Sequence, residues 1–503
     1  MDHSEVQAGC FGQFFARKAR SRAPLQRPRP SPSSQAQDGP SEGTAENSHV
    51  YYQVSETLKT GEKTQQGDIS YFNPCCDFSY GKQDERWIEQ QQPPSYTPKI
   101  PTLSNTSDVC SVIERTLDKK SSDLRALSLK IHDHPELMFE ERYAHDVLTE
   151  FMAEHGFKIT KHYLGLETAW RAEYTQGTGG RVIGINSEMD ALPGIGHACG
   201  HNLIAISGVG VAIALKAALQ ARPEVSAKII LLGTPAEEGG GGKVILLERG
   251  GYDEMDACVM CHPSAGLPHS TSLGSSTAMQ YFLVEYFGHS AHAGGAPWEG
   301  TNALDAAFIA YSGISMLRQQ MKPDHRVHGV VEGRNWLPNV IPDYARMRWI
   351  ARAPTSEDLI PFAKRVQNCL EAAALATGCR IKLTVETSYF NLHQNSVLAQ
   401  DFADIVGSRY GLAATSASTS ASTDFGNVSY ALPALHPAFA IPTEANGGNH
   451  TLAFAKAARS EAAHSATIAV AKGLALTGYR VLTDAEFFSK VQATFEQGKK
   501  SEC

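Results

Sequence analysis

A long apolar segment flanked by two strand-like segments is the feature that most limits the fold of this chain. Residues 181–189, RVIGINSEM, and residues 227–235, AKIILLGTP, are rich in the aliphatic residues of buried strands. Between them, residues 203–221, LIAISGVGVAIALKAALQA, are apolar over a length that suits a buried helix. This strand, helix, strand order, with polar or glycine-rich residues where each strand ends, predicts an α/β sheet with its functional site at the carboxyl-terminal edge.

The pattern changes after about Ala278. Strand-like and helix-like segments then alternate in the order β-α-β-α-β, at residues 279–288, 301–321, 345–353, 356–378 and 380–390. This order predicts a small two-layer α+β domain. The α/β pattern returns after about residue 390, so we expect residues 278–389 to be inserted into one α/β domain made of residues 106–277 and 390–485.

Both ends of the chain are expected to be tails. Residues 1–105 are rich in Ser, Pro, Gln and charged residues and bury too little apolar surface to offset ordering, which predicts a disordered low-complexity tail. Residues 486–503 are expected to form a C-terminal tail. The basic run from Arg17 to Arg29 is either a nuclear signal or a solvated arm.

Composition narrows the class of partner and the compartment. A net charge of −8 and a pI near 6.2 argue against a broad nucleic-acid interface and favour a small-molecule partner. We expect no membrane span, because no run of about 18 apolar residues stands out. The N-terminus has acids before its apolar patch and basic residues after it, the reverse of a secretory signal, which predicts a cytoplasmic protein with nuclear entry as an alternative. The ten cysteines are then expected to be thiols, ligands or bystanders.

Cys199 and His201 form a candidate ligand pair within MDALPGIGHACGHN, residues 189–202. Thiolate and imidazole are both good zinc ligands, and alternate spacing in a glycine-containing loop can aim both side chains at one ion. The alternative is a Cys-x-His pair without function, which this segment alone does not exclude.

Glu237 and Glu238 follow a predicted strand directly, in TPAEEGGGG. Adjacent carboxylates repel each other unless a cation or solvent separates them. One acid could bind a metal while its neighbour acts as general base for a metal-bound water. A solvated acidic turn is the alternative.

Two further histidines complete the candidate set. His262 follows another apolar strand-like segment, and His450 lies in GGNHTLAF near the end of the folded region. A single histidine is more often a surface or core residue than a ligand. Here, however, segments that end in turns or glycine-rich loops together supply Cys, Glu and His, the ligand types of a dinuclear site.

The motifs of the chain resemble those of the aminoacylase and carboxypeptidase family of co-catalytic metallopeptidases. Within that family they are most similar to the amidohydrolase branch, which also contains dipeptidases that act on basic dipeptides. The resemblance covers about residues 108–485 and rests on the segments MDALPGIGHACGHN, TPAEEGGGG, AHAGGAPWEGTNALDA, PNVIP and STDFGNV. It implies a catalytic domain with a central mixed sheet flanked by helices, and a small inserted lid and dimerisation domain.

The resemblance also implies roles for individual residues. Glu237 is the general base, and Asp190 is the acid that orients a metal ligand. Two divalent ions are implied, with zinc expected and manganese or cobalt as alternatives. The implied ligands are Cys199, His201, Glu238, His262 and His450.

Two positions depart from the family pattern. Much of the family has a metal-binding histidine where this chain has Glu188. In the cysteine-containing branch the Cys199 and His201 pair takes over coordination, so Glu188 is not expected to be a ligand. Asn202 stands where many relatives have Asp, and we expect this change to adjust the surroundings of the ligands.

The inserted domain carries three further candidates. His292 matches a histidine that reaches into the active site of the partner subunit and helps to stabilise an oxyanion. Asn339 and Arg352 match positions that hold the carboxylate of the substrate, and a guanidinium suits this task because its planar fork can grip a carboxylate with two hydrogen bonds. The resemblance therefore implies a homodimer that forms through the lid.

These expectations describe metal-dependent hydrolysis of the amide bond of dipeptides or N-acyl amino acids that carry a free carboxylate. The resemblance favours basic C-terminal residues such as Lys, ornithine or Arg. Two alternatives remain at this point. One is a general amidohydrolase for N-acyl amino acids or conjugates in a biosynthetic pathway, and the other is an inactive scaffold of the same fold.

Overall fold

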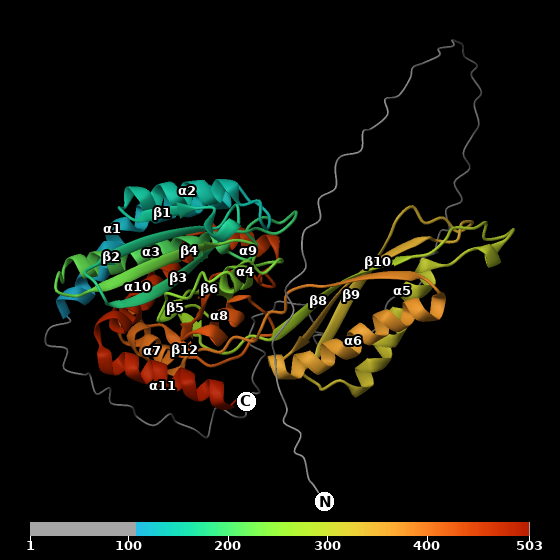
Figure 1. Cartoon of the computed structure of the whole chain (residues 1–503). Helices are drawn as coiled ribbons and strands as arrows, with labels where there is room; N and C mark the ends of the chain where they lie inside the picture. The colour runs from blue at the N-terminus through green and yellow to red at the C-terminus, as the bar shows by residue number, and fades with distance from the viewer. Residues whose placement is uncertain (1–106, 502–503) are drawn as a thin grey trace, which may run out of the picture. The chain divides into compact units, whose positions relative to one another are not determined.

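The computed structural model describes residues 107–501, which are coloured in Figure 1. The tail expected at residues 1–105 and the basic run from Arg17 to Arg29 lie outside the described residues. The described chain forms a large α/β part and a smaller part with its own sheet.

A six-stranded mixed sheet forms the centre of the large part. Its strand order is β1-β2-β4-β3-β5-β13, in which β4, β3, β5 and β13 are parallel and β1 and β2 are antiparallel to their neighbours. The expected mixed sheet is thus confirmed. The strands are β1 (Lys158–Lys161), β2 (Trp170–Gln176), β3 (Arg181–Glu188), β4 (Ala227–Thr234), β5 (Ala257–Val259) and β13 (Ala434–Leu435).

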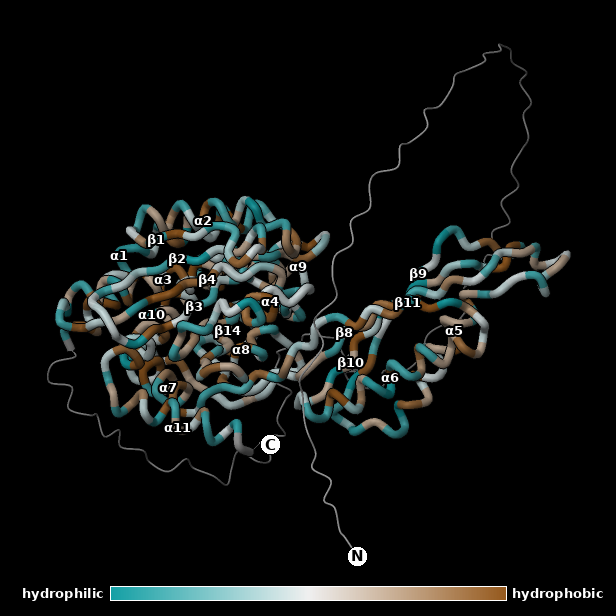
Figure 2. The backbone as a smooth tube through the Cα atoms, viewed as in Figure 1, coloured by the Kyte–Doolittle hydropathy of each residue, from teal (hydrophilic) through white to brown (hydrophobic). Residues whose placement is uncertain are grey.

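Helices cover both faces of this sheet. Successive side chains of β4 therefore pack into two different hydrophobic cores, one on each face. Ile229 and Leu231 pack with residues of α1 (Ser107–His132), α3 (His201–Gln220) and α10 (Glu461–Thr483). Ile230 and Leu232 point the other way and pack with residues of α4 (Gly242–Glu248) and α8 (Phe425–Ala431). Figure 2 shows hydrophobic colour along the inner elements α3, β3 and β4. A sheet buried on both faces explains the nearly continuous apolar runs of β3 and β4.

Helix α3 departs from one expectation drawn from composition. By length and hydropathy it could cross a membrane, although no such run was expected. In the structure 89% of its 18-residue apolar window is buried, and the helix packs between β3, α1 and α10. Its hydrophobicity is accounted for by its place in the core.

A second sheet and several helices complete the large part. The second sheet has the order β12-β7-β14-β6, with β6 (His262–Ala265), β7 (Ser270–Ser272), β12 (Ala413–Thr415) and β14 (Ala438–Ile441). The remaining helices are α2 (Arg142–Glu154), the short η2 (Tyr163–Gly165), α7 (Ser396–Tyr410), α9 (Leu452–Ala458) and α11 (Ala485–Ser501).

Helix α11 corrects the prediction of a C-terminal tail at residues 486–503. The helix packs on α7 and α10, and it buries Phe487, Phe488, Val491 and Phe495. The prediction was wrong because the segment AEFFSKVQATFEQGKKS is polar overall, while its apolar residues recur at helical spacing on one face.

The smaller part, here called the lid, is a two-layer α+β unit with its own core. Its antiparallel sheet has the order β11-β8-β10-β9, and α5 and α6 lie together on one side of it (Figure 1). The elements are β8 (Ala278–Phe287), η3 (Pro297–Glu299), α5 (Ala303–Leu317), η4 (Arg318–Gln320), β9 (Arg326–Gly333), β10 (Tyr344–Ala353), α6 (Ser356–Thr377) and β11 (Arg380–Val385).

The order of the lid elements is β-α-β-β-α-β and not the expected β-α-β-α-β, because strand β9 was missed. Among residues 107–501 this strand pairs with β10 alone, and it lies at the edge of the sheet, so most of its residues are at least partly exposed. Gly329 interrupts the apolar pattern of the strand. A larger residue does not fit at this position, because its Cβ would lie 2.4 Å from the ring of Trp349. An edge strand with an internal glycine lacks the alternation by which strands are predicted.

Candidate metal centre

The candidate residues lie where parallel strands end. Glu188 is the last residue of β3, Glu237 and Glu238 follow the end of β4, and His262 begins β6 shortly after β5. Because β4 and β5 both run parallel to β3, their carboxyl ends meet at the same edge of the sheet.

A glycine allows the loop that carries Cys199 and His201 to approach the strand of His262. Gly200 has a φ of 82°, and a Cβ there would lie 2.6 Å from Cγ of Pro263. His201 is the first residue of α3, so its side chain projects from the start of that helix. The backbone N–H of His450 donates to the carbonyl of Ala198 at 2.8 Å, which ties the last candidate segment to this loop.

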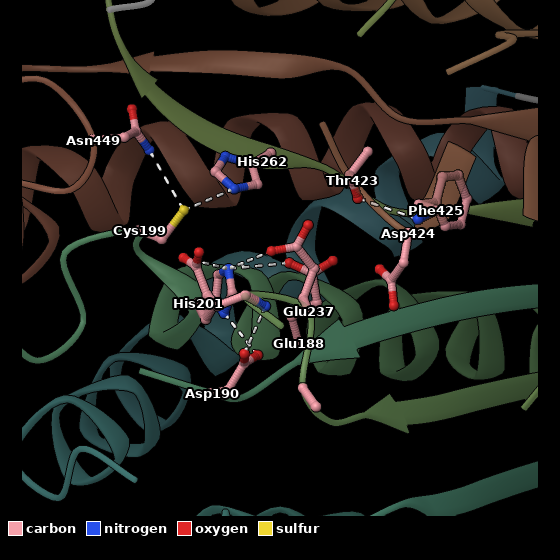
Figure 3. A network of polar contacts seen from close by, with 12 residues as sticks. Glu188, Asp190, Cys199, His201, Glu237, His262, Thr423, Asp424, Phe425 and Asn449 are labelled. Carbon is pink, nitrogen blue, oxygen red and sulfur yellow. Dashed lines mark hydrogen bonds and ion pairs between the residues drawn. The ribbon is translucent and has the colours of Figure 1, made fainter. Parts of the chain in front are cut away.

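The expected ligand side chains converge in one cluster, and Figure 3 shows three of them, Cys199, His201 and His262. Sγ of Cys199 lies 3.3 Å from Nε2 of His262, and Nε2 of His450 lies 3.2 Å from Oε1 of Glu238. Three groups offer ligand atoms within 4.8 Å of one another, namely Cys199 with His201 and His262, Cys199 with Glu238 and His450, and Glu188 with His201 and Glu237.

Asp190 links two members of the cluster. Its Oδ1 lies 3.1 Å from Nδ1 of His201, and its Oδ2 accepts a hydrogen bond of 2.9 Å from the backbone N–H of Glu238. The contact at Nδ1 leaves Nε2 of His201 directed into the cluster. This is the contact expected of a carboxylate that orients a ligating imidazole.

A buried acid that sequence reasoning missed supports the turn of Glu237 and Glu238. Ala236 has a φ of 59°, and its N–H donates to Oε1 of Glu141 at 2.8 Å. Thr168 donates to Oε2 of the same carboxyl at 2.7 Å. Burial, helped by the charge of Asp190, raises the pKa of Glu141 to about 7. Nothing in the sequence separates Glu141 from the neighbouring acids.

Burial is the largest cause of the pKa shifts of three side chains in the cluster, Glu237, Cys199 and His262. Burial and the charges of Glu188 and Glu238 raise the pKa of Glu237 well above its usual range. Burial and the nearby carboxylates of Glu238 and Glu237 raise the pKa of the Cys199 thiol in the same way. Burial also lowers the pKa of His262 to about 4, so this imidazole is neutral at physiological pH.

The pKa of His201 shifts upward, opposite to that of His262. Burial disfavours its imidazolium, but the ion pairs with Asp190 and Glu188 outweigh burial and raise its pKa to about 10. His201 is therefore held as a cation at neutral pH unless another cation replaces its proton.

Glu188 belongs to the cluster, although it was not expected to be a ligand. Its Oε2 lies 3.3 Å from Nε2 of His201, and its Oε1 lies 2.7 Å from Nζ of Lys243. Lys243 also pairs with Asp424 at 2.6 Å, and all three side chains are fully buried. Sequence reasoning missed Lys243 and Asp424. The signals available were a lysine at the start of the apolar helix α4 and the acid of STDFGNV.

Asn202 has a packing contact. Its side-chain amide donates to Oγ of Ser128 at 2.9 Å and to the carbonyl of Ala458 at 3.2 Å. It therefore joins α3 to α1 and α9, and these contacts do not involve the ligand side chains.

The three candidates of the inserted domain lie in the lid and not in the cluster. His292 forms a β-bridge with Val340, and the carbonyl of Asn339 accepts a hydrogen bond of 3.0 Å from Ala293, so His292 and Asn339 lie on neighbouring segments. Arg352 donates to Oγ of Ser422 at 2.7 Å, at the junction between the lid and the large part. The strands that hold the cluster belong to the large part.

The cluster has the charge and the donor atoms of a site for divalent cations. The side chains of Glu188, Asp190, Glu237 and Glu238 are at most 10% exposed. Buried acids need compensating charge, and Lys243 and a protonated His201 offset only part of it. In the described part of the chain, Nε2 of His201 has no hydrogen-bond partner although it is buried. Thiolate, imidazole and carboxylate are the donor types that zinc prefers.

Comparisons with known proteins agree with this arrangement. A model of "Peptidase family M20/M25/M40" matches residues 184–497. The chain is 41% identical over 398 residues to the Xaa-Arg dipeptidase of Mus musculus and 38% identical over 400 residues to that of Homo sapiens, and each match covers 76% of this chain and 90% of the relative. A Bacillus subtilis protein described as a dinuclear metal-binding peptidase of the M20 family has a TM-score of 0.55 at 21% identity, over 73% of this chain and 99% of that one.

Proposed function

Because the chain belongs to peptidase family M20/M25/M40, we propose that it is a metal-dependent hydrolase of dipeptides and N-acyl amino acids that carry a free carboxylate. The resemblance inferred from the motifs is confirmed at the level of the family. The observation that supports the activity most strongly is the buried cluster of thiol, imidazole and carboxylate groups at the carboxyl ends of β3, β4 and β5. Its complete donor set argues against an inactive scaffold.

The proposed cofactor is a pair of divalent ions, with zinc as the preferred metal. Bound ions would polarise the scissile carbonyl and acidify a water molecule. The residues proposed to hold them are Cys199, His201, Glu238, His262 and His450, and the three overlapping donor groups of the cluster support this set.

Glu237 is the proposed general base. Its carboxylate lies in the cluster, with Oε2 3.8 Å from Nε2 of His201, and the side chain is only 7% exposed. A pKa raised by burial and by Glu188 and Glu238 makes this carboxylate a stronger base than a solvated one. It can therefore take a proton from the attacking water and deliver it to the leaving nitrogen.

The lid is proposed to bind and enclose the substrate. Arg352 and Asn339 would hold the carboxylate of the substrate, and His292 would stabilise the oxyanion in the partner subunit of a homodimer. A dimer through the lid has support from α5, whose Phe308 is 58% exposed and whose Met316 is 70% exposed.

A basic residue at the carboxyl end of the substrate is the proposed preference, supported by the identity to the Xaa-Arg dipeptidases. We expect β-Ala-Lys and similar basic dipeptides to have a kcat/KM at least about tenfold above that of N-acyl amino acids with aromatic or long acyl groups. The same dipeptides with an amidated carboxyl end should lose about 100-fold in kcat/KM, because Arg352 and Asn339 lose the carboxylate that they are proposed to hold. The measurement is a substrate panel at fixed metal concentration.

The outcomes of the panel separate the candidate activities. Failure on every basic dipeptide would contradict the dipeptidase preference. Turnover of N-acyl amino acids in that case would support the general amidohydrolase.

Metal binding should release protons and become tighter as pH rises. A ligating imidazole must be neutral and a ligating cysteine must be a thiolate, whereas the structure holds His201 as a cation and Cys199 as a thiol at neutral pH. We therefore expect at least two protons to leave when both sites fill at pH 7, one from His201 and one from Cys199, and the affinity to increase by up to about tenfold per pH unit for each proton. Calorimetric titration of the metal-free protein with zinc, in buffers of different ionisation enthalpy, measures this number. Binding without proton release would show that neither residue is a ligand.

A further inference from the structure

The carboxylate of Glu188 has a different partner at each of its oxygens. Oε1 lies 2.7 Å from Nζ of Lys243. Oε2 lies 3.3 Å from Nε2 of His201, and Figure 3 shows Glu188 beside His201. Glu188 and His201 are both 0% exposed. Within residues 107–501, neither Oε2 of Glu188 nor Nε2 of His201 forms a hydrogen bond. These two buried atoms therefore face each other as an ion pair, and no hydrogen bond in the described part of the chain fixes either of them.

Lys243 fixes the first of these oxygens. Its side chain is fully buried, and its Nζ also lies 2.6 Å from Oδ1 of Asp424. Its backbone N–H donates to Oδ2 of the same carboxyl at 2.9 Å. Lys243 is the second residue of α4, directly after the glycines that follow Glu238, so the ammonium is anchored at the edge of the cluster by backbone and side chain.

We propose that Glu188 supplies Oε2 as a further ligand to the cation bound by His201, and that Lys243 is the positioning residue that holds Glu188 for this task. This inference rests on the proposed metal-dependent function. It adds to the ligand set a residue that the motif comparison left out, and it gives a role to a lysine and an acid outside that set.

The spacing supports a shared cation. Two N or O donors that bind one zinc ion at about 2.0–2.1 Å in tetrahedral geometry lie about 3.3 Å apart. The distance between Oε2 of Glu188 and Nε2 of His201 has this value. Oε2 of Glu237 completes a group in which every donor lies within 4.8 Å of the others.

The charges support the same conclusion. Lys243 carries one positive charge between the carboxylates of Glu188 and Asp424, so the buried triad retains one negative charge. Because its ammonium contacts Oε1, only Oε2 of Glu188 remains to face the cluster. Protonated His201 balances this charge in the metal-free protein, and a metal ion that replaces its proton would balance it in the metal-bound protein, as buried carboxylates require.

Metal retention tests the inference without reference to turnover. The purified holoenzyme is dialysed against a chelator, and zinc per chain is followed by elemental analysis. Glu188→Gln should lose one of its two ions at least about tenfold faster than the unaltered protein. Lys243→Met should lose the same ion about tenfold faster, because Glu188 is no longer held, and the visible absorption of the cobalt-substituted protein should shift. Retention within threefold in both variants would overturn the inference.

A distant pair provides the matched control. Asp401 is buried in α7 and pairs with Arg480 of α10, so Asp401→Asn also removes a buried acid from an ion pair. It should lower the melting temperature and leave metal retention unchanged. Equal metal loss in this control would show that general destabilisation explains the effect, and would contradict the role of Glu188.

The double variant Glu188→Gln with Lys243→Met separates a ligand from a structural partner. It removes both charges of that pair together, which buried pairs tolerate better than the loss of one member, and it is made together with Asp424→Asn so that no buried carboxylate is left without its lysine. If Glu188 only neutralises Lys243, the combined variant should retain metal like the unaltered protein, and this result would overturn the inference. If Glu188 is a ligand, metal loss should remain fast.

Two further results complete the test. Should Glu188→Gln fail to fold, Glu188→Asp keeps the charge but withdraws the oxygen by one carbon, and it should still lose metal faster. Unchanged retention in that variant would overturn the inference. An unaltered protein that holds no divalent metal would instead refute the proposed function, which distinguishes the two failures.

Discussion

A Glu237→Gln variant is expected to lose about 10³-fold in kcat while it keeps its bound metal. The amide has the shape of the carboxylate but cannot accept the proton of the attacking water. The side chain is 7% exposed, and its Oε2 lies 3.8 Å from Nε2 of His201, so bulk solvent does not supply a substitute base at this position. Steady-state kinetics on a basic dipeptide, with zinc measured on the same sample, provide both numbers.

The adjacent acid is the matched comparison. Glu238→Gln alters a proposed ligand that lies 3.2 Å from His450, and it should reduce metal content together with activity. Metal loss in Glu237→Gln would show that Glu237 is a ligand. A kcat within tenfold of the unaltered value would show that it is not the base.

A Cys199→Ser variant should lose metal and activity together, by about 100-fold or more. Cys199 is the one residue shared by the donor group of His201 and His262 and the donor group of Glu238 and His450. A serine hydroxyl in this buried place does not ionise near neutral pH, so the soft anionic donor at the centre of the cluster would be lost. Zinc content after gel filtration and kcat/KM with and without added zinc measure the effect.

Cys258→Ser is the control for this change. Cys258 is another fully buried thiol, on β5, and its Sγ contacts Asn186 outside the donor groups. The control should keep its metal. Normal metal content in Cys199→Ser would make Cys199 a bystander, which is the alternative reading of its short motif.

Most elements of the fold can be predicted from the local pattern of apolar and polar residues. The apolar runs of β3, α3 and β4 predict the type and order of these elements. Each element is largely buried on all sides, and a buried element requires apolar residues along its length. Strand β9 and helix α11 were not predicted correctly, because an edge strand is half exposed and a surface helix shows its apolar stripe only at helical period.

Some residues of the candidate site could likewise be recognised in the sequence, and others could not. The ligand types could be recognised in the sequence because Cys199, His201, Glu238 and His262 lie in unusual glycine-rich or strand-end segments. Glu141 and Lys243 are an ordinary acid and an ordinary lysine in the sequence. They became visible only when folding buried them beside Ala236 and Glu188.

The sequence by itself determined the two-part α/β architecture, the family and the chemical types of the donors. Only the tertiary structure decided that Glu188 lies between His201 and Lys243, and that Asp424 closes the ion pairs of that lysine. The physical reason is that residue patterns report how each segment is buried. The partner of a buried charge, by contrast, depends on distances between segments as far apart as β3 and α8.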